Sequence, residues 1–343
     1  FMACVSAHAE TLSFDVSADA YSEPASIRAF TSKWQDSYSG GDTAFAQGRA
    51  EITLHQPERD LAVFWRYDYL LKFTPETALL VYDYKNGNIP TGGQYPLSLQ
   101  AHYSEAYGLR WQPFFQPTPN LTLGVGFSLL KGYKLTEGQV HGLINLNGQR
   151  FDRHAVNNIN LAIDYHYDEP ELYEDRLDWH PRNPSGEGFS VDLSGLWRYR
   201  RTTIRLQIND IIGMIYWRDT PTTRYQARYQ AAPPDHELTG QLAIDHNYRQ
   251  PLPTHGFIEF SQQWSLRWST TIKVLANRDN QLATLSSACH WRQWQAAVLA
   301  EPQSRAWGLE LRHPGFYLRW LADSLNTNDA HRLGLTLGLT QAW

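Results

Sequence analysis

Four arginines are the residues of this chain whose type and spacing most readily suggest chemistry. They fall in segments where large apolar and polar side chains alternate, so each lies on the polar face of a strand. If the apolar faces point outward, the arginines point into a shared interior. A row of cations there would set up an electrostatic field that favours anionic or sugar-like solutes. The arginines are Arg198, Arg205, Arg224 and Arg228, on three consecutive expected strands, interleaved with Asp192, Gln207, Asn209, Gln226 and Gln230.

Further charged residues occupy the polar faces of other segments. Glu51 and Asp68 lie on two early segments, and Asp164 and His166 share one face of a later segment. We interpret all four as lining residues of the same interior. The alternative is that these charges pair with one another and only stabilise the wall, since a wide barrel needs a polar inside whatever it carries.

Catalytic and cofactor patterns are weak in this sequence. The Asp164-x-His166 spacing could serve general acid–base chemistry, although a lone Asp-x-His on a strand is far more often a hydrogen bond in the lumen. His141 shares a face with Asn145 and Asn147, which loosely resembles the site of outer-membrane phospholipases, but the serine that this site needs is missing. We therefore predict no enzymatic activity and no catalytic residues.

Composition argues against metal, phosphate and nucleic-acid binding. Apart from Cys4 the only cysteine is Cys289, and the 13 histidines are scattered. Gly92-Gly93 lacks the Lys-Ser/Thr of a phosphate-binding loop. A formal charge of -5 offers no basic face for nucleic acid. We predict no metal, no cofactor and no nucleic-acid partner.

The elements that would position these residues are long strands. Apolar and polar residues alternate over ten or more positions, which is typical of strands that cross a lipid bilayer, whereas strands of soluble sandwiches average about five or six residues. Tyrosine (19) and tryptophan (13) are abundant, and many apolar faces end in one of them, as expected at a membrane boundary. The clearest alternating segments are 43–55, 61–73, 119–130, 158–167 and 188–200.

The C-terminal segment alternates without a break. Leucines, among them Leu337 and Leu339, share one face with Trp343, and Gly and Thr occupy the other. This segment resembles the last strand of bacterial outer-membrane β-barrels, although Trp343 stands where those proteins usually have Phe. The resemblance implies that Leu337, Leu339 and Trp343 form an assembly signal. It also implies contact with the barrel assembly machinery, outer-membrane lipid and lipopolysaccharide.

A second resemblance covers about 30 residues from Gly188 to Gly213, which are similar to a hairpin of FadL-like and TraF-like barrels. It implies architecture only. We expect an all-β, transmembrane antiparallel β-barrel of about 16 strands (range 14–18), in one domain over residues 10–343. Residues 74–96 are irregular and could enter the lumen or cap one end. The polar stretches 168–187 and 218–222 are expected loops.

The first nine residues have a separate interpretation. Ala7-His8-Ala9 matches the small-x-small pattern before a signal-peptidase site, so residues 1–9 are expected to be the end of a signal peptide. A lipid anchor on Cys4 is the alternative.

Together these patterns predict a cell outer-membrane channel for small polar or anionic solutes. A different class of function is also open, namely an anchor or conduit in a secretion, pilus or polysaccharide-export assembly. A soluble secreted β-protein is a further alternative.

Overall fold

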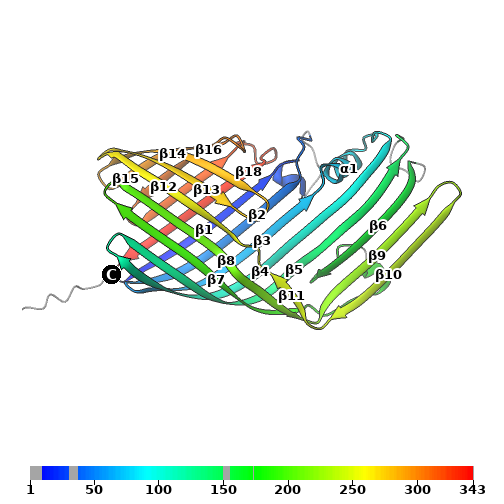
Figure 1. The fold of residues 1–343 in the computed structure, drawn as a ribbon, viewed down its shortest axis with the longest axis horizontal. Coiled ribbons are helices and arrows are strands. Elements are labelled where there is room, and N and C mark those ends of the chain that lie inside the picture. Colours follow the sequence, from blue (N-terminus) through cyan, green and yellow to red (C-terminus); the bar gives the residue numbers. More distant parts are fainter. Residues whose placement is uncertain (1–9, 31–37, 150–154, 173, 343) are drawn as a thin grey trace, which may run out of the picture.

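The computed structural model describes residues 10–30, 38–149, 155–172 and 174–342. Their strands form one antiparallel sheet that closes on itself, because β1 pairs with β18 as well as with β2. Fourteen strands make the closed ring and four more lie outside it (Figure 1). The predicted all-β barrel with 14–18 strands is confirmed, while the single value of 16 overestimates the ring.

The elements have the following bounds. The strands are β1 (Thr11–Ser22), β2 (Thr43–Gln56), β3 (Arg59–Phe73), β4 (Gly93–Thr118), β5 (Leu121–Leu146), β6 (Val156–Tyr167), β7 (Ser185–Tyr199), β8 (Thr202–Arg218), β9 (Thr220–Gln230), β10 (Asp235–Asp245), β11 (Tyr248–Pro251), β12 (His255–Ser265), β13 (Trp268–Ala276), β14 (Gln281–Trp291), β15 (Trp294–Glu301), β16 (Ala306–His313), β17 (Phe316–Ala322) and β18 (Arg332–Ala342). The helices are η1 (Ile27–Phe30), α1 (Pro75–Asn86) and η2 (Glu174–Leu177).

The four strands outside the ring arise because some long lines of the wall are divided into two or more consecutive strands. β5 pairs with β7 along its first half and with β6 along its second half. β8 and β9 follow one another along the same line of the wall. Only Asp219 separates them, and its left-handed backbone (φ 56°) interrupts the strand at that one residue. The expected loop at 218–222 is therefore wrong, because the chain passes from β8 into β9 there. β6, β9 and β10 extend the wall beyond the closed ring as a flange, seen on the right of Figure 1.

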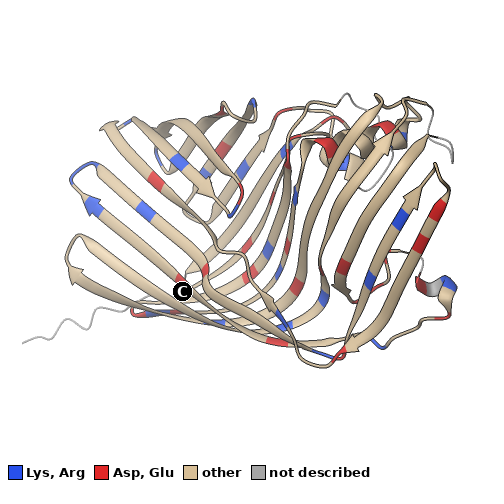
Figure 2. Cartoon of the chain, turned by 45° about the vertical axis from the view of Figure 1, so that its right-hand side comes forward, with Lys and Arg blue, Asp and Glu red and all other residues tan. Residues whose placement is uncertain are grey.

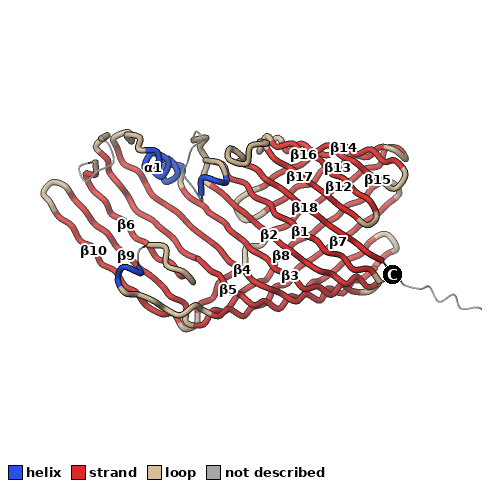
Figure 3. Tube along the Cα trace, turned by 180° about the vertical axis from the view of Figure 1, so that it is seen from behind, coloured by secondary structure: helices blue, strands red, loops and turns tan. Residues whose placement is uncertain are grey.

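The two ends of the barrel differ in their connections. One end, called the turn end, carries two-residue turns, among them Arg200-Arg201 between β7 and β8. The opposite end, called the rim, carries α1 and longer connections (Figure 3). Short turns at one end and long loops at the other are typical of outer-membrane barrels.

The outer face of the barrel is apolar, as the alternation predicts. Leu129 is 69% exposed, Leu109 59% and Val63 58%, although each lies in the middle of a strand. Exposed tryptophans flank the turns at the turn end: Trp264, Trp268, Trp291 and Trp294. An apolar band bordered by aromatic rings is the surface that a spanning barrel presents to lipid.

Helix α1 lies at the rim and does not enter the lumen. The Thr74 side chain caps its N-terminus by accepting from the Thr77 backbone N–H, and Gly87 ends it in the left-handed conformation. Leu80 packs against Tyr95 and Leu146, which lie on the outward-facing sides of β4 and β5. No helix of the described residues is long and apolar enough to cross a bilayer.

Candidate functional site

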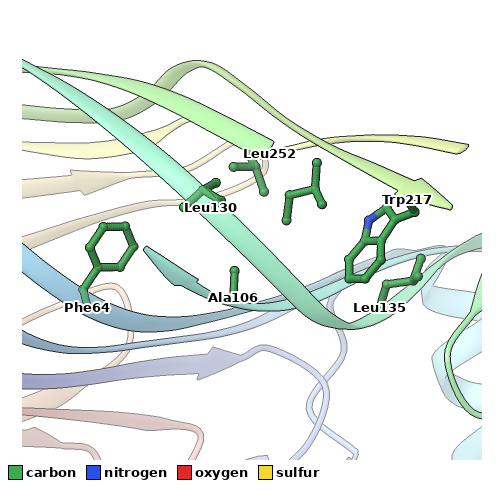
Figure 4. Close-up of a cluster of buried hydrophobic side chains, with 7 residues drawn as sticks. Phe64, Ala106, Leu130, Leu135, Trp217 and Leu252 are labelled. Carbon is green, nitrogen blue, oxygen red and sulfur yellow. The ribbon is translucent and has the colours of Figure 1, made fainter. Parts of the chain in front are cut away.

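Seven apolar side chains meet inside the barrel, on the face where the wall is otherwise polar (Figure 4). They come from β3, β4, β5, β8 and the residue that follows β11. We call this group the apolar bridge, and its members are Phe64, Ala106, Leu130, Leu135, Ile215, Trp217 and Leu252. The strand registers place Phe64, Leu130 and Ile215 in one row of paired positions, with Gly108 and Gly188 on the strands between them, so the group covers the inner face of the wall from β3 to β8.

Trp217 is the largest member of the apolar bridge and is 1% exposed. Its ring lies over the backbone of β5, where a Cβ at Gly132 would come within 2.7 Å of the ring, so only glycine leaves room for it. The Trp217 indole N–H donates to Gln250 Oε1 (3.0 Å). The Gln250 amide in turn donates to the Tyr103 carbonyl on β4 (3.0 Å). These bonds fix β11 across the interior against β4.

A buried ion cluster lies beside the apolar bridge. The Arg66 guanidinium on β3 donates to both carboxylate oxygens of Asp210 on β8, at 2.8 and 2.7 Å. It also donates to Asp68 at 2.6 Å. Ser190 donates to Asp210, and Asp192 accepts the Asp210 backbone N–H. Such a bidentate pair is directional and strong, so it ties two distant strands together.

The turn between β13 and β14 makes a further crossing nearer the rim. The Asn280 amide donates to Thr43 on β2 (2.7 Å), and the Arg278 guanidinium donates to Gln100 on β4 (3.1 Å). Leu282 packs against Phe45 and Leu70. Strands from opposite parts of the ring are therefore joined at several levels of the interior.

Polar cavities lie on both sides of the apolar bridge. Toward the turn end is a chamber of about 320 Å³, which we call the basic chamber. Six arginines, one lysine and two glutamates line it: Arg198, Arg200, Arg201, Arg205, Arg312, Arg319, Lys273, Glu259 and Glu310. An adjoining cavity of about 530 Å³ includes Arg205, Glu51 and Arg110. Figure 2 shows that charged residues lie along the strands of the wall as well as in the connections.

Toward the rim, a cavity of about 380 Å³ forms a vestibule on the inner face of the flange. Asp164 and His166 both line it, as their shared face predicts. Asp164 pairs with Arg224 on β9 (3.2 Å), and the His166 ring stacks on Tyr248 with 3.8 Å between centroids. The partners of Asp164 and His166 are therefore Arg224, Asp245 and Tyr248, and no contact joins the two side chains to each other.

The structure separates the four arginines of the expected row. Arg198 and Arg205 line the same basic chamber. Arg224 and Arg228 face the same interior side but lie on the flange, because β9 extends β8 and does not return beside it. A shared passage lined by all four arginines stays a prediction.

The expected acidic lining residues also divide into two groups. Glu51 lines the cavity next to the basic chamber and pairs with Arg49 (2.5 Å) and Arg110. Asp68 and Asp192 are 3% and 2% exposed and belong to the packed ion cluster and its surroundings. A role in lining a passage stays a prediction for all of these residues.

Sequence reasoning missed the residues that cross the interior. Arg66 and Asp68 stood on an expected inward face, but nothing marked Asp210 as their partner. The one available signal is the pair Ile211-Ile212, which breaks the alternation just after Asp210. The structure places a register shift between β7 and β8 there, and Asp210 has a φ of 55°.

Other expectations have mixed outcomes. The signal peptide at 1–9, its alternative at Cys4, and Trp343 lie outside the described residues. Leu339 faces outward opposite Phe14 on β1, and Leu337 lies opposite Val16. Their role in assembly stays a prediction. No group of three potential metal ligands is found within the described ranges.

The polar stretch after β6 folds back onto the outer face of the flange. Trp179 donates to the Tyr167 hydroxyl (3.0 Å), and Tyr165 and Glu174 form a hydrogen bond. Together with β3–β6, the segment encloses an apolar outer pocket of about 420 Å³ that includes Tyr69, Leu99 and Leu172. The expected loop at 168–187 is correct except for its last residues, which begin β7.

Asp168 anchors the start of this loop and leads to a pH prediction. Its carboxylate accepts from the Leu135 backbone N–H (2.9 Å), while burial raises its pKa above 3.8. A carboxyl group with a raised pKa stabilises the folded loop at pH values below 3.8, and that contribution is lost as the pH rises through the raised value. Asp168→Asn keeps the acceptor without the charge.

We therefore expect amide exchange of 168–184 at pH 7 to be about threefold slower in Asp168→Asn than in the wild type, and equal in the two proteins near pH 3. Hydrogen exchange with mass spectrometry measures this. Faster exchange in the variant at pH 7 would contradict the role assigned to burial of the charge.

Comparison with known proteins finds distant structural likenesses only. No protein-family model and no curated protein matches the chain. Among solved structures, it is similar to the CymD monoaromatic hydrocarbon channel (8% identity, TM-score 0.45, covering 98% of this chain and 89% of that one). It is also similar to the P. putida toluene transporter TodX (9%, 0.44, 98% and 90%) and to a Pseudomonas aeruginosa FadL homologue (10%, 0.36, 98% and 90%).

These likenesses are too distant to transfer a cargo or a residue role. The predicted outer-membrane type of β-barrel is confirmed in architecture. The closed antiparallel ring and its apolar outer face carry that conclusion.

Proposed function

We propose that this chain is an outer-membrane transport barrel with a gated interior. One observation supports it above the others: polar cavities lie on both sides of an apolar bridge within a barrel whose outside is apolar. Side chains of the wall occupy the interior between these cavities, and the described residues include no separate plug domain. Passage then requires the apolar bridge and the ion cluster to separate, which β11 and its neighbouring segments could do as a unit.

The charge of the basic chamber favours anionic solutes. Seven cationic side chains face two glutamates in a cavity enclosed by the wall. In such a confined space fewer counterions screen the field, so it raises the local concentration of anions. Arg205 borders both this chamber and the neighbouring cavity, and its nearest acidic partner, Glu259, is 3.8 Å away. Arg205 is therefore well placed to act on a passing solute.

Single-channel recording in planar bilayers tests this proposal. We expect rare openings of the wild type, with a preference for anions. Arg205→Ala should lower the anion-to-cation permeability ratio about twofold, and Arg205→Glu should lower it further. Arg228→Glu on the flange is the matched control and should leave the ratio unchanged. Equal ratios in the wild type and Arg205→Glu would contradict a role for the chamber.

A second candidate cargo is a small hydrophobic molecule. The outer apolar pocket supports it, since its lining is dominated by side chains such as Tyr69, Leu71 and Leu99. Monoaromatic hydrocarbons and toluene are the cargo named for two of the similar structures. Uptake of labelled toluene into proteoliposomes separates the candidates, because an anion channel would not accelerate it.

The assembly alternative favours an anchor over a conduit. An exported polymer needs a continuous wide passage, whereas two contacts cross the interior of this barrel, from Arg66 to Asp210 and from Asn280 to Thr43. Contacts with outer-membrane lipid, lipopolysaccharide and the barrel assembly machinery stay predictions that follow from the outer-membrane location.

A further inference from the structure

A cavity of about 520 Å³ outside the lumen combines aromatic walls with one carboxylate. It lies where the outward-facing sides of β2, β3 and β4 meet the segment that contains η1. Trp65, Tyr67, Tyr69 and Tyr103 contribute rings, and Glu105 contributes the charge. We call these five residues the aromatic cage. Lys, Arg and His do not occur among the described residues that line the cavity.

Glu105 faces outward among the apolar and aromatic residues of the wall, where a charge is unexpected. Three neutral groups donate to its carboxylate: the Tyr103 hydroxyl, the Tyr133 hydroxyl and the Trp65 indole N–H (3.3 Å). Glu105 takes part in none of the ion pairs found within the described part of the chain. Its negative charge is thus held in place by neutral donors and is not neutralised by the protein.

The nearest candidate counter-ion is directed elsewhere. Lys134 lies directly opposite Glu105 in the β4–β5 register. Its ammonium group contacts Asp168 (3.4 Å) and Glu169, both in the connection after β6. The register shift at this point leaves Tyr133 as the extra residue of β5, and Tyr133 supplies one of the donors to Glu105. The local backbone therefore adds a hydroxyl donor beside Glu105, while the lysine is directed toward the loop.

The rings are fixed by their own contacts. Trp65 and Tyr67 lie 5.7 Å apart between centroids, and Tyr69 meets Tyr103 edge-on at 6.2 Å and 71°. Tyr67 packs against Gly48, where a Cβ would lie 2.3 Å from the ring. Contacts within the protein therefore hold the rings of the cage in place, which reduces the entropy lost on binding.

We propose that the aromatic cage binds an organic ammonium cation, of the trimethylammonium or alkylammonium class. Aromatic faces attract such cations through their quadrupole, and a carboxylate without a counter-ion attracts them further through its negative charge. A quaternary ammonium group cannot donate conventional hydrogen bonds, so it suits a site whose acceptor positions are largely taken by the protein. This site is independent of the anion route proposed for the lumen.

Choline and its uncharged isostere 3,3-dimethylbutanol, titrated calorimetrically into the detergent-purified full chain, test the proposal. We expect choline to bind at least tenfold more tightly than the isostere, because both fill the cavity but only one is charged. Glu105→Gln should weaken choline binding about tenfold and leave the isostere unaffected. Glu187→Gln, which changes an exposed carboxylate elsewhere, is the control and should not alter either affinity.

A second variant tests the site in case Glu105→Gln does not fold correctly. Gly48→Ala displaces Tyr67 without touching the carboxylate, and it should weaken choline binding at least threefold while heat-modifiable gel mobility stays that of a folded barrel. Equal affinity for choline and the isostere, or unchanged choline binding in Glu105→Gln, would overturn the proposal.

The cation could be a free solute or a lipid headgroup, and nanodiscs distinguish the two. Phosphatidylcholine retained on the protein by native mass spectrometry, in excess over phosphatidylglycerol and lost in Glu105→Gln, identifies a headgroup. Choline binding without such retention identifies a soluble cation. Absence of both would refute the site.

Discussion

Arg66→Met is expected to destabilise the barrel by about 3–5 kcal/mol, because it leaves two carboxylates buried without their cation. Arg66 pairs with Asp68 and Asp210, which are only 3% and 1% exposed, so water does not solvate either carboxylate where it lies. The same change removes the bidentate link between β3 and β8 across the interior. Equilibrium urea unfolding in detergent measures the loss of stability, and planar-bilayer recording should show more frequent openings.

Two further variants separate the buried charge from other effects. Arg66→Gln combined with Asp68→Asn and Asp210→Asn removes all three charges, and asparagine tolerates the left-handed backbone at 210. This triple variant should recover more than half of the lost stability. Arg218→Met removes an exposed partner of Glu187 and should cost less than about 1 kcal/mol. If Arg66→Met proves no more costly than Arg218→Met, the ion cluster does not hold the interior together.

The wall of the barrel could be predicted from the sequence because one physical rule governs it. Side chains alternate between lipid and interior, so segments such as 43–55 and 61–73 match β2 and β3 to within two residues. The rule fails where the alternation changes phase. β5 runs to Leu146, but the extra residue Tyr133 shifts the pattern, and only 119–130 had the expected period.

The crossings of the interior could not be predicted, because alternation gives the face of a residue and not its partner across the lumen. Arg66 lies on the inward face of β3, yet its partner Asp210 lies on β8, 144 residues later in the chain. The separation of Arg205 from Arg224 has a similar origin. Only one left-handed residue, Asp219, lies between β8 and β9, so the two strands follow one line of the wall. In the sequence, an aspartate at such a position looks like a residue of an ordinary turn between antiparallel strands.

The cage on the outer face illustrates the same limit. Tyr67 and Tyr69 belong to an alternating apolar face, which indicates only contact with lipid or a membrane boundary. Glu105 can be recognised as a charge on the outer face only if it is known which alternate residues of β4 point outward. Its three donors come from β3, β4 and the shifted part of β5, so only the paired register brings them together.

Trp217→Ala should open the interior and cost about 3–5 kcal/mol of stability, since it removes the largest side chain of the apolar bridge. The cavity would adjoin Leu130, Leu135 and Ile215, and Gln250 would lose the indole donor that orders β11. We expect lower urea midpoints and a steady conductance in place of rare openings. Because the basic chamber is intact, the current should keep its preference for anions.

Two controls separate closure of the interior from general damage. Trp217→Phe keeps an aromatic ring in the group but loses the hydrogen bond to Gln250 and the outer part of the indole over Gly132, so less stability should be lost than in Trp217→Ala, with little added conductance. Trp307→Ala removes an outward-facing tryptophan that is 45% exposed and should leave conductance at the wild-type level. A Trp217→Ala barrel that folds with lowered stability yet conducts no more than the wild type would show that the apolar bridge stabilises the barrel without closing its passage. In that case the other crossing, where Asn280 meets Thr43 and Leu282 meets Phe45, would have to act as the barrier.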